Sequence, residues 1–216
     1  TDQGITWLKR AERIPSPNSI AFISSGNIYL GCDPLGLYRS DDEGETVTRL
    51  DSYLFPLLVY SLHIDSADNI YVGSYRGNLY RTSNGGISWN HIFVDSVLSP
   101  IVAVTSLSPG ELYVAGSFGG VRRSTNGGIS WQNLGLQNRN IMCLAYDEDG
   151  DLVVGSDSGL FRYDGTDTNW SSIGLSQFRI TSILINNDKE IIAGTHNAGI
   201  FSSTDKGNSW IARNTN

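Results

Sequence analysis

The chain has 216 residues and a formal net charge of -7, with 24 glycines, ten tyrosines and five tryptophans. This acidic balance leaves no basic field for a phosphate backbone, which argues against nucleic-acid binding. No apolar segment reaches the roughly 18 residues that a membrane-spanning helix needs, so we expect no membrane insertion.

One eight-residue motif recurs along the whole chain. Its clearest copy runs from Ser124 to Trp131, and others run from Thr82 to Trp89 and from Ser203 to Trp210. The copy from Ser40 ends in Val47 instead of tryptophan, Tyr163 to Trp170 is a degenerate copy, and Asp2 to Trp7 is a tail. The closing positions 7, 47, 89, 131, 170 and 210 are therefore 39 to 42 residues apart, a period typical of repeat folds.

Within each period, short alternating segments separated by polar turns predict four strands. In the second repeat we expect strands at 59–64, 70–73, 79–82 and from Trp89 onward. The fourth repeat gives 141–146, 151–155, 160–163 and a strand opened by Trp170, and the fifth gives 180–185, 191–194, 200–203 and one from Trp210. No segment has the spacing of a long amphipathic helix, so we expect almost no helix.

Four antiparallel strands in about 41 residues form one blade, and a blade cannot bury both of its apolar faces alone. The sequence therefore predicts an all-β fold, a β-propeller of five four-stranded antiparallel blades, with residues 1–216 as a single domain. An orphan fourth strand at Trp7 leaves ring closure open. Because residue 1 falls inside a repeat, we expect the chain to be part of a longer protein.

The repeated motif is interpreted as a structural turn between the third and fourth strands. Its Asp or Asn accepts hydrogen bonds from turn amides, its glycine supplies a positive φ, and its tryptophan packs between sheets. The residues assigned this structural role are Asp2, Trp7, Asp42, Asn84, Trp89, Asn126, Trp131, Trp170, Asp205 and Trp210.

Ser-x-Asp-x-Gly-x-Thr-Trp is the Asp-box, or BNR repeat, and the chain resembles the Asp-box β-propellers along its whole length. That superfamily includes sialidases, xyloglucan-degrading glycosidases, sortilin-type receptors and the photosystem II assembly factor. The segment from Asp149 to Leu160 is also similar to propellers in periplasmic parts of two-component sensors. The resemblance implies that the boxes lie on turns remote from the functional face.

Function is therefore expected on the opposite side, in the turns between second and third strands and in the links between blades. One residue from each of these turns is predicted to converge near the axis: Asp33, Tyr75, Phe118, Asp157 and His196. The links add Arg139 and Arg179. Carboxylates and aromatic rings in such a set suit a sugar or a peptide, and the alternative is that each residue only finishes a turn or plugs the channel.

The resemblance also raises a glycosidase alternative. Arg13 to Pro15 resembles the Arg-Ile-Pro motif of sialidases, which with Arg139 and Arg179 would grip an acidic sugar while Asp33 donates a proton. Short turns between the second and third strands argue against a deep pocket, and no Tyr nucleophile with a paired Glu can be assigned.

Other candidate sites are weaker. Asp147, Asp149 and Asp151 alternate like the start of a calcium loop, but Ser158 stands where that site needs a glutamate. The histidines offer no zinc spacing, and Cys32 and Cys143 are predicted to be buried free thiols, so no metal or cofactor is expected. We predict a non-enzymatic scaffold at the cell surface, in the periplasm or outside the cell, which binds a protein or carbohydrate.

Overall fold

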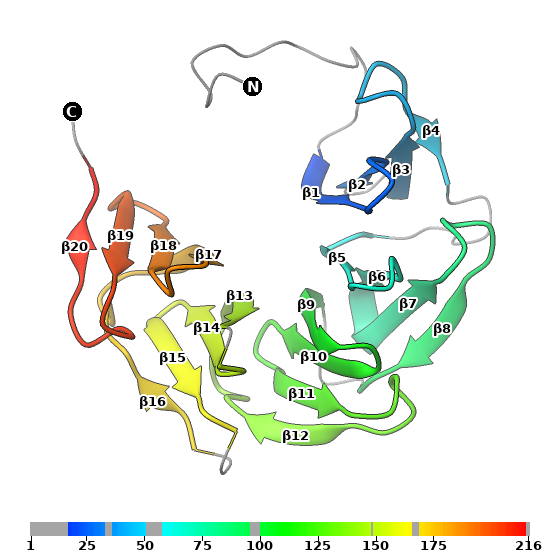
Figure 1. The fold of residues 1–216 in the computed structure, drawn as a ribbon. Coiled ribbons are helices and arrows are strands. Elements are labelled where there is room, and N and C mark those ends of the chain that lie inside the picture. Colours follow the sequence, from blue (N-terminus) through cyan, green and yellow to red (C-terminus); the bar gives the residue numbers. More distant parts are fainter. Residues whose placement is uncertain are drawn as a thin grey trace.

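The computed structural model describes residues 17–32, 36–50, 58–95, 100–147, 149–165 and 169–214. These residues form five four-stranded antiparallel sheets, in each of which the strands follow one another in sequence order. Figure 1 shows the sheets as blades that succeed one another around a central axis. The prediction of an all-β, five-bladed propeller is confirmed.

The strands, numbered along the chain, fall into the five blades in order. Blade 1 contains β1 (Pro17–Phe22), β2 (Ile28–Cys32), β3 (Gly36–Ser40) and β4 (Thr48–Arg49). Blade 2 contains β5 (Ser61–Ile64), β6 (Ile70–Gly73), β7 (Asn78–Thr82) and β8 (Asn90–Phe93). Blade 3 contains β9 (Ile101–Ser108), β10 (Glu111–Gly116), β11 (Gly120–Ser124) and β12 (Gln132–Gly135). Blade 4 contains β13 (Ile141–Tyr146), β14 (Leu152–Ser156), β15 (Gly159–Tyr163) and β16 (Ser171–Ser172). Blade 5 contains β17 (Ile180–Ile185), β18 (Ile191–Thr195), β19 (Ile200–Ser203) and β20 (Ile211–Ala212).

In the second, fourth and fifth repeats, for which the sequence predicts strand ranges, the observed strand boundaries lie within two residues of the predicted ones. The tryptophans stand one residue before the fourth strands rather than opening them. The one helical element among the described residues is the short 3-10 turn η1 (Tyr75–Gly77). None of the helical structure in the described ranges is long and apolar enough to cross a membrane.

We call the side of the propeller that carries the turns between third and fourth strands the lower side. In blade 3, Ser124 Oγ accepts from the Gly128 amide at 2.8 Å, and Asn126 Oδ1 accepts from the Ser130 amide at 2.9 Å. The same two bonds recur in blades 1, 2 and 5. Gly128 has a φ of 91°, and a Cβ there would come within 2.8 Å of Ile92, so the turn needs glycine for conformation and for space.

The tryptophans that close the turns between third and fourth strands in blades 2 to 5 pack beside the outer strand of a blade. Trp89, Trp131, Trp170 and Trp210 contact the aliphatic core around Leu50, Ile92, Leu134 and Ile173, respectively. The indole of Trp170 also donates to the Leu134 carbonyl at 2.7 Å. The buried indole nitrogen of Trp131 finds no hydrogen-bond partner among the described residues. The tryptophans thus join neighbouring blades.

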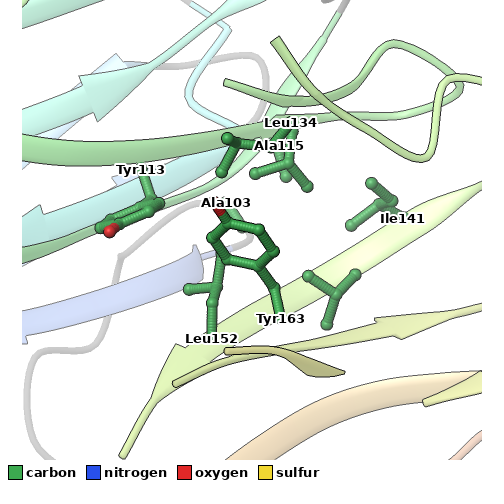
Figure 2. Packing of buried hydrophobic residues seen from close by; sticks show 9 residues of the cluster. Ala103, Tyr113, Ala115, Leu134, Ile141, Leu152 and Tyr163 are labelled. Atoms are coloured by element: carbon green, nitrogen blue, oxygen red, sulfur yellow. The ribbon is translucent and has the colours of Figure 1, made fainter. Parts of the chain in front are cut away.

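The interface between blades 3 and 4 shows how the blades bury their faces. Figure 2 shows Tyr113, Ala115 and Leu134 of blade 3 on one side and Ile141 and Tyr163 of blade 4 on the other. These side chains are almost fully buried and form one apolar cluster. The sector between blade 5 and blade 1 contains none of the described strands (Figure 1).

A row of arginines on the third strands was not anticipated from the sequence. The same strand position holds Arg39, Arg81, Arg123 and Arg162 in blades 1 to 4. Arg123 donates to Glu111 at 2.6 Å, a pair that is largely removed from solvent. In blade 5 the position is Ser202, and Arg213 from beyond β20 donates to its hydroxyl at 2.8 Å. Both contacts join neighbouring segments of one blade, so we interpret them as structural.

Candidate binding site on the upper side

The upper side carries the turns between second and third strands, where the sequence places the predicted site. Tyr75, Phe118, Asp157 and His196 each follow β6, β10, β14 and β18, and all four are exposed. Asp33 lies outside the described residues, as do Asp2, Trp7 and Arg13. The four described residues therefore sit on one side of the molecule, at the turns of four consecutive blades.

Backbone hydrogen bonds fix these turns to the links between blades. The Ser117 amide donates to the Pro100 carbonyl at 3.2 Å, and the Asp157 amide donates to the Asn140 carbonyl at 3.1 Å. The His196 amide donates to the Arg179 carbonyl at 3.0 Å in the same way. Because each turn is bonded to the link that leads into its own blade, the exposed side chains project from a rigid base.

Two of the exposed side chains are aromatic and are held by unusual backbone. Tyr75 is 47% exposed and begins η1, in which Arg76 has a φ of 57°. Phe118 is 59% exposed and itself has a φ of 63°. A bulky residue in the left-handed region costs of order 1 kcal/mol or more, and an exposed ring gains little from burial. Neither feature helps folding, which makes Phe118 the stronger functional candidate.

The two link arginines contact different parts of blade 4. The Arg139 guanidinium lies 5.1 Å from the centroid of the Phe161 ring and donates to Ser158 Oγ at 2.9 Å. Arg179 Nη2 lies 3.6 Å from Met142 Sδ, on the innermost strand β13. Arg139 is thus engaged over the third strand and Arg179 beside the axis. These contacts do not bring the two guanidinium groups together as one clamp.

A cavity of about 280 Å³ lies among the inner strands. Asn18, Val102 and Met142 contribute to its lining from β1, β9 and β13. Met142 also contacts Arg179, which places a cationic side chain next to the cavity. The described lining contains no Asp, Glu or His, and its titratable members are Tyr60 and Cys143.

The structure also contains a polar contact between blades that the sequence did not suggest. His63 Nε2 lies 2.7 Å from Ser106 Oγ, and Ser106 is buried. Burial lowers the pKa of His63 to about 4, against a smaller opposing effect of Asp65. A neutral histidine that joins β5 to β9 is a structural element. Its isolated position in an apolar strand gave no signal of a partner 43 residues away.

The carboxylates that resemble the start of a calcium loop are paired with basic side chains. Asp147 and Asp151 both accept from Arg162. Asp149 accepts from Lys189 at 2.8 Å, and this contact joins blades 4 and 5. Both cysteines are free as predicted and Cys32 is buried. Desolvation raises the pKa of the half-buried Cys143 to about 12, which favours the protonated thiol.

Solved structures with the same fold include proteins of different roles. The extracellular domain of BT4673 from B. thetaiotaomicron matches with a TM-score of 0.76 at 21% identity, over 91% of this chain and 28% of that one. A structure described as YCF48 bound to D1 peptide matches with a TM-score of 0.76 at 17% identity, over 94% and 68%. The GH74 enzyme of Niastella koreensis matches with a TM-score of 0.76 at 14% identity, over 91% and 37%.

At these identities the likeness shows the fold, and the chain spans less than two thirds of the BT4673 domain and of the GH74 enzyme. No curated protein matches the sequence significantly. A family model described as photosynthesis system II assembly factor YCF48 matches residues 1–216, the whole chain. The chain therefore belongs to the photosynthesis system II assembly factor YCF48 family, within the BNR-type β-propellers.

Proposed function

We propose that this chain is a non-enzymatic, extracytoplasmic propeller whose upper side binds a protein partner. The observation that carries the proposal is the exposed pair Tyr75 and Phe118, on turns of adjacent blades that are bonded rigidly to the scaffold. Exposed aromatic rings on a preorganised base are typical anchors of protein interfaces. Arg179 and His196, which lie at blade 5, add donors on the same side for the carbonyl and carboxylate groups of a polypeptide.

Two relatives support the class of partner and the location. A structure of YCF48 holds a D1 peptide, so one protein of this fold accommodates a polypeptide segment. The BT4673 domain is extracellular. Membership of the YCF48 family therefore favours a protein partner over a carbohydrate.

A phage-displayed library of dodecapeptides is a direct probe of the upper side. Peptides selected on the wild-type chain are expected to bind the double variant Tyr75→Ala, Phe118→Ala at least tenfold more weakly. The matched control is Ile87→Ala, Ile129→Ala, because these side chains are 76% and 86% exposed on the lower side of blades 2 and 3. Equal affinity for the wild type and the upper-side variant would contradict the proposal.

A glycoside hydrolase is the alternative that the GH74 fold neighbour raises. That chemistry needs two carboxyl groups facing each other across the scissile bond. Asp157 is the one carboxylate among the four described turn residues of the predicted site, and the cavity lining has none. Purified protein is therefore expected to leave fluorogenic sialosides and β-glucosides intact. Turnover that disappears in Asp33→Ala would establish the enzymatic alternative.

A further inference from the structure

The outermost strands of the five blades differ in length and regularity. β4, β16 and β20 contain two residues each. β12 contains four, but its pairing with β11 shifts register between Val121 and Arg122. β8 contains four residues that pair with β7 without any shift. Among the described outer strands, β8 is the longest regular edge, and it lies on the outside of blade 2 (Figure 1).

The direction of the hydrogen bonds at β8 follows from its register. The Val94 amide donates to the Gly77 carbonyl at 3.0 Å, and Phe93 lies opposite Asn78. Because antiparallel pairing alternates, the backbone groups of Asn90 and Ile92 face β7, and those of His91 and Phe93 face outward. In the described part of the chain, no strand pairs with this outer edge.

The side chains of β8 leave its outward groups accessible. His91 Nε2 lies 2.7 Å from Asn78 Oδ1, and its ring centroid lies 5.2 Å from that of Tyr80. These contacts hold the imidazole over the face of the sheet rather than across its edge. Phe93 is 57% exposed.

The devices that usually protect an edge strand are missing from β8. In natural proteins, bulges, Pro or charged residues keep edge strands from pairing with other chains, and β8 has none of these. Blades 3 and 4 carry Gly135 and Gly174 where blade 2 carries Phe93. These glycines have φ values of 106° and 107°, and neither β12 nor β16 extends beyond them. Among the five outer strands as described, β8 alone includes an exposed aromatic residue.

We propose that β8 is a strand-addition site, at which an extended segment of a partner protein adds a fifth strand to blade 2. Two amides and two carbonyls at two-residue spacing match the backbone of another strand. An aromatic or β-branched residue of the partner would pack beside Phe93. The net charge of -7 favours a neutral or basic segment. This site is separate from the upper-side function proposed above and does not depend on it.

The probe is the fluorescein-labelled peptide KKTVYVTKK, whose neutral core consists of β-branched residues on either side of a tyrosine, with KKTPYPTKK as a control of equal charge. Fluorescence anisotropy at physiological ionic strength is expected to show saturable binding of the first peptide only. Amide hydrogen exchange by NMR is expected to slow at His91 and Phe93 on binding, with Asn90 and Ile92 unchanged. Absence of protection at His91 and Phe93 would overturn the proposal.

Variants separate this site from the rest of the surface. His91→Pro removes an outward amide and is expected to weaken binding at least tenfold. Ala212→Pro is the matched control on β20, because Arg213 donates to the Ile200 carbonyl at 2.8 Å and Ala212 therefore faces outward too. Phe93→Lys places a charge on the edge strand and keeps the backbone amide, so it tests the same site without the effects of proline. Binding that survives His91→Pro and Phe93→Lys but is lost in Tyr75→Ala, Phe118→Ala would overturn the proposal.

A second copy of the chain could also pair with β8, and it has to be distinguished from a partner protein. Sedimentation of the free protein is expected to show no self-association through β8. A dimer that dissociates in Phe93→Lys would replace the partner peptide with another copy and would also overturn the proposal.

Discussion

On the lower side of the propeller, four turns between third and fourth strands share the same hydrogen bonds, whereas the turns on the upper side differ from blade to blade in residues and backbone. Ser124 and Asn126 satisfy the amides of their own turn. Phe118 on the upper side projects into solvent from a left-handed backbone. The turns that repeat make contacts that the blades need for folding. The turns that vary carry residues that folding does not require. Function is therefore to be sought where the repeats disagree.

The largest loss of stability is expected on the lower side, from Trp170→Ala. This change removes a ring that packs on Leu134 and Tyr163 between two blades, and such truncations cost about 3–5 kcal/mol. Chemical denaturation would measure it. Trp170→Phe is expected to cost about 1–2 kcal/mol more than Trp131→Phe, because the Trp170 indole donates to a carbonyl and the Trp131 indole has no described partner. Equal costs would show that the hydrogen bond is unimportant.

Acid is expected to weaken the contact between blades 2 and 3 through His63. Its folded pKa of about 4 lies below the ordinary value of 6.5, so the unfolded chain binds the extra proton between these pH values. The stability that the neutral imidazole contributes is complete above pH 6.5 and is lost as the pH falls toward 4. The gap between the two pKa values corresponds to about 3 kcal/mol.

Denaturation curves between pH 7 and pH 4 would measure this loss. His63→Asn is expected to flatten the pH dependence, and His91→Asn serves as the control because His91 is exposed. A slope that survives His63→Asn would assign the effect to other groups.

A smaller effect of pH on stability is expected to distinguish the lower-side turn that contains Asp205 from the one that contains Asn126. Hydrogen bonds from Ser209 and Ser203 lower the pKa of Asp205 to about 2. The stability that its carboxylate contributes is present above pH 3.8, the ordinary value, and is lost as the pH falls toward 2. Asn126 makes equivalent contacts without charge, since its Nδ2 donates to Ser130 Oγ at 2.8 Å.

Asp205→Asn is therefore expected to lower the melting temperature by a few degrees at neutral pH and to remove the acid dependence of this turn. Asn126→Asp is expected to create such a dependence in blade 3. Melting temperatures measured from pH 5 to pH 2 would test both changes, and indistinguishable pH profiles for the two variants and the wild type would refute them.

Much of the fold could be predicted because it depends on local and periodic signals. The segments 141–146 and 180–185 are short, largely apolar and bounded by polar turns, and they form β13 and β17 with those bounds. The partner of His63 could not be predicted, because Ser106 reaches it only after the blades have stacked. The regular edge at β8 was equally hidden, since it depends on where the neighbouring blades place glycines. The sequence placed Tyr75, Phe118, Asp157 and His196 at the correct turns, and their binding role remains a prediction.

The smallest effect is expected on the upper side, and its sign is opposite. Phe118→Asn replaces a bulky left-handed residue by one that tolerates this backbone, so stability is expected to rise by about 0.5–1 kcal/mol while binding of the selected peptides falls. Leu175→Asn is the matched control, because Leu175 has a φ of 54° but is buried against blade 5. That change is expected to cost about 2 kcal/mol or more through the loss of apolar burial. If both variants lost stability, Phe118 would stabilise the fold by packing, as Leu175 does. That result would contradict the view that folding does not require Phe118.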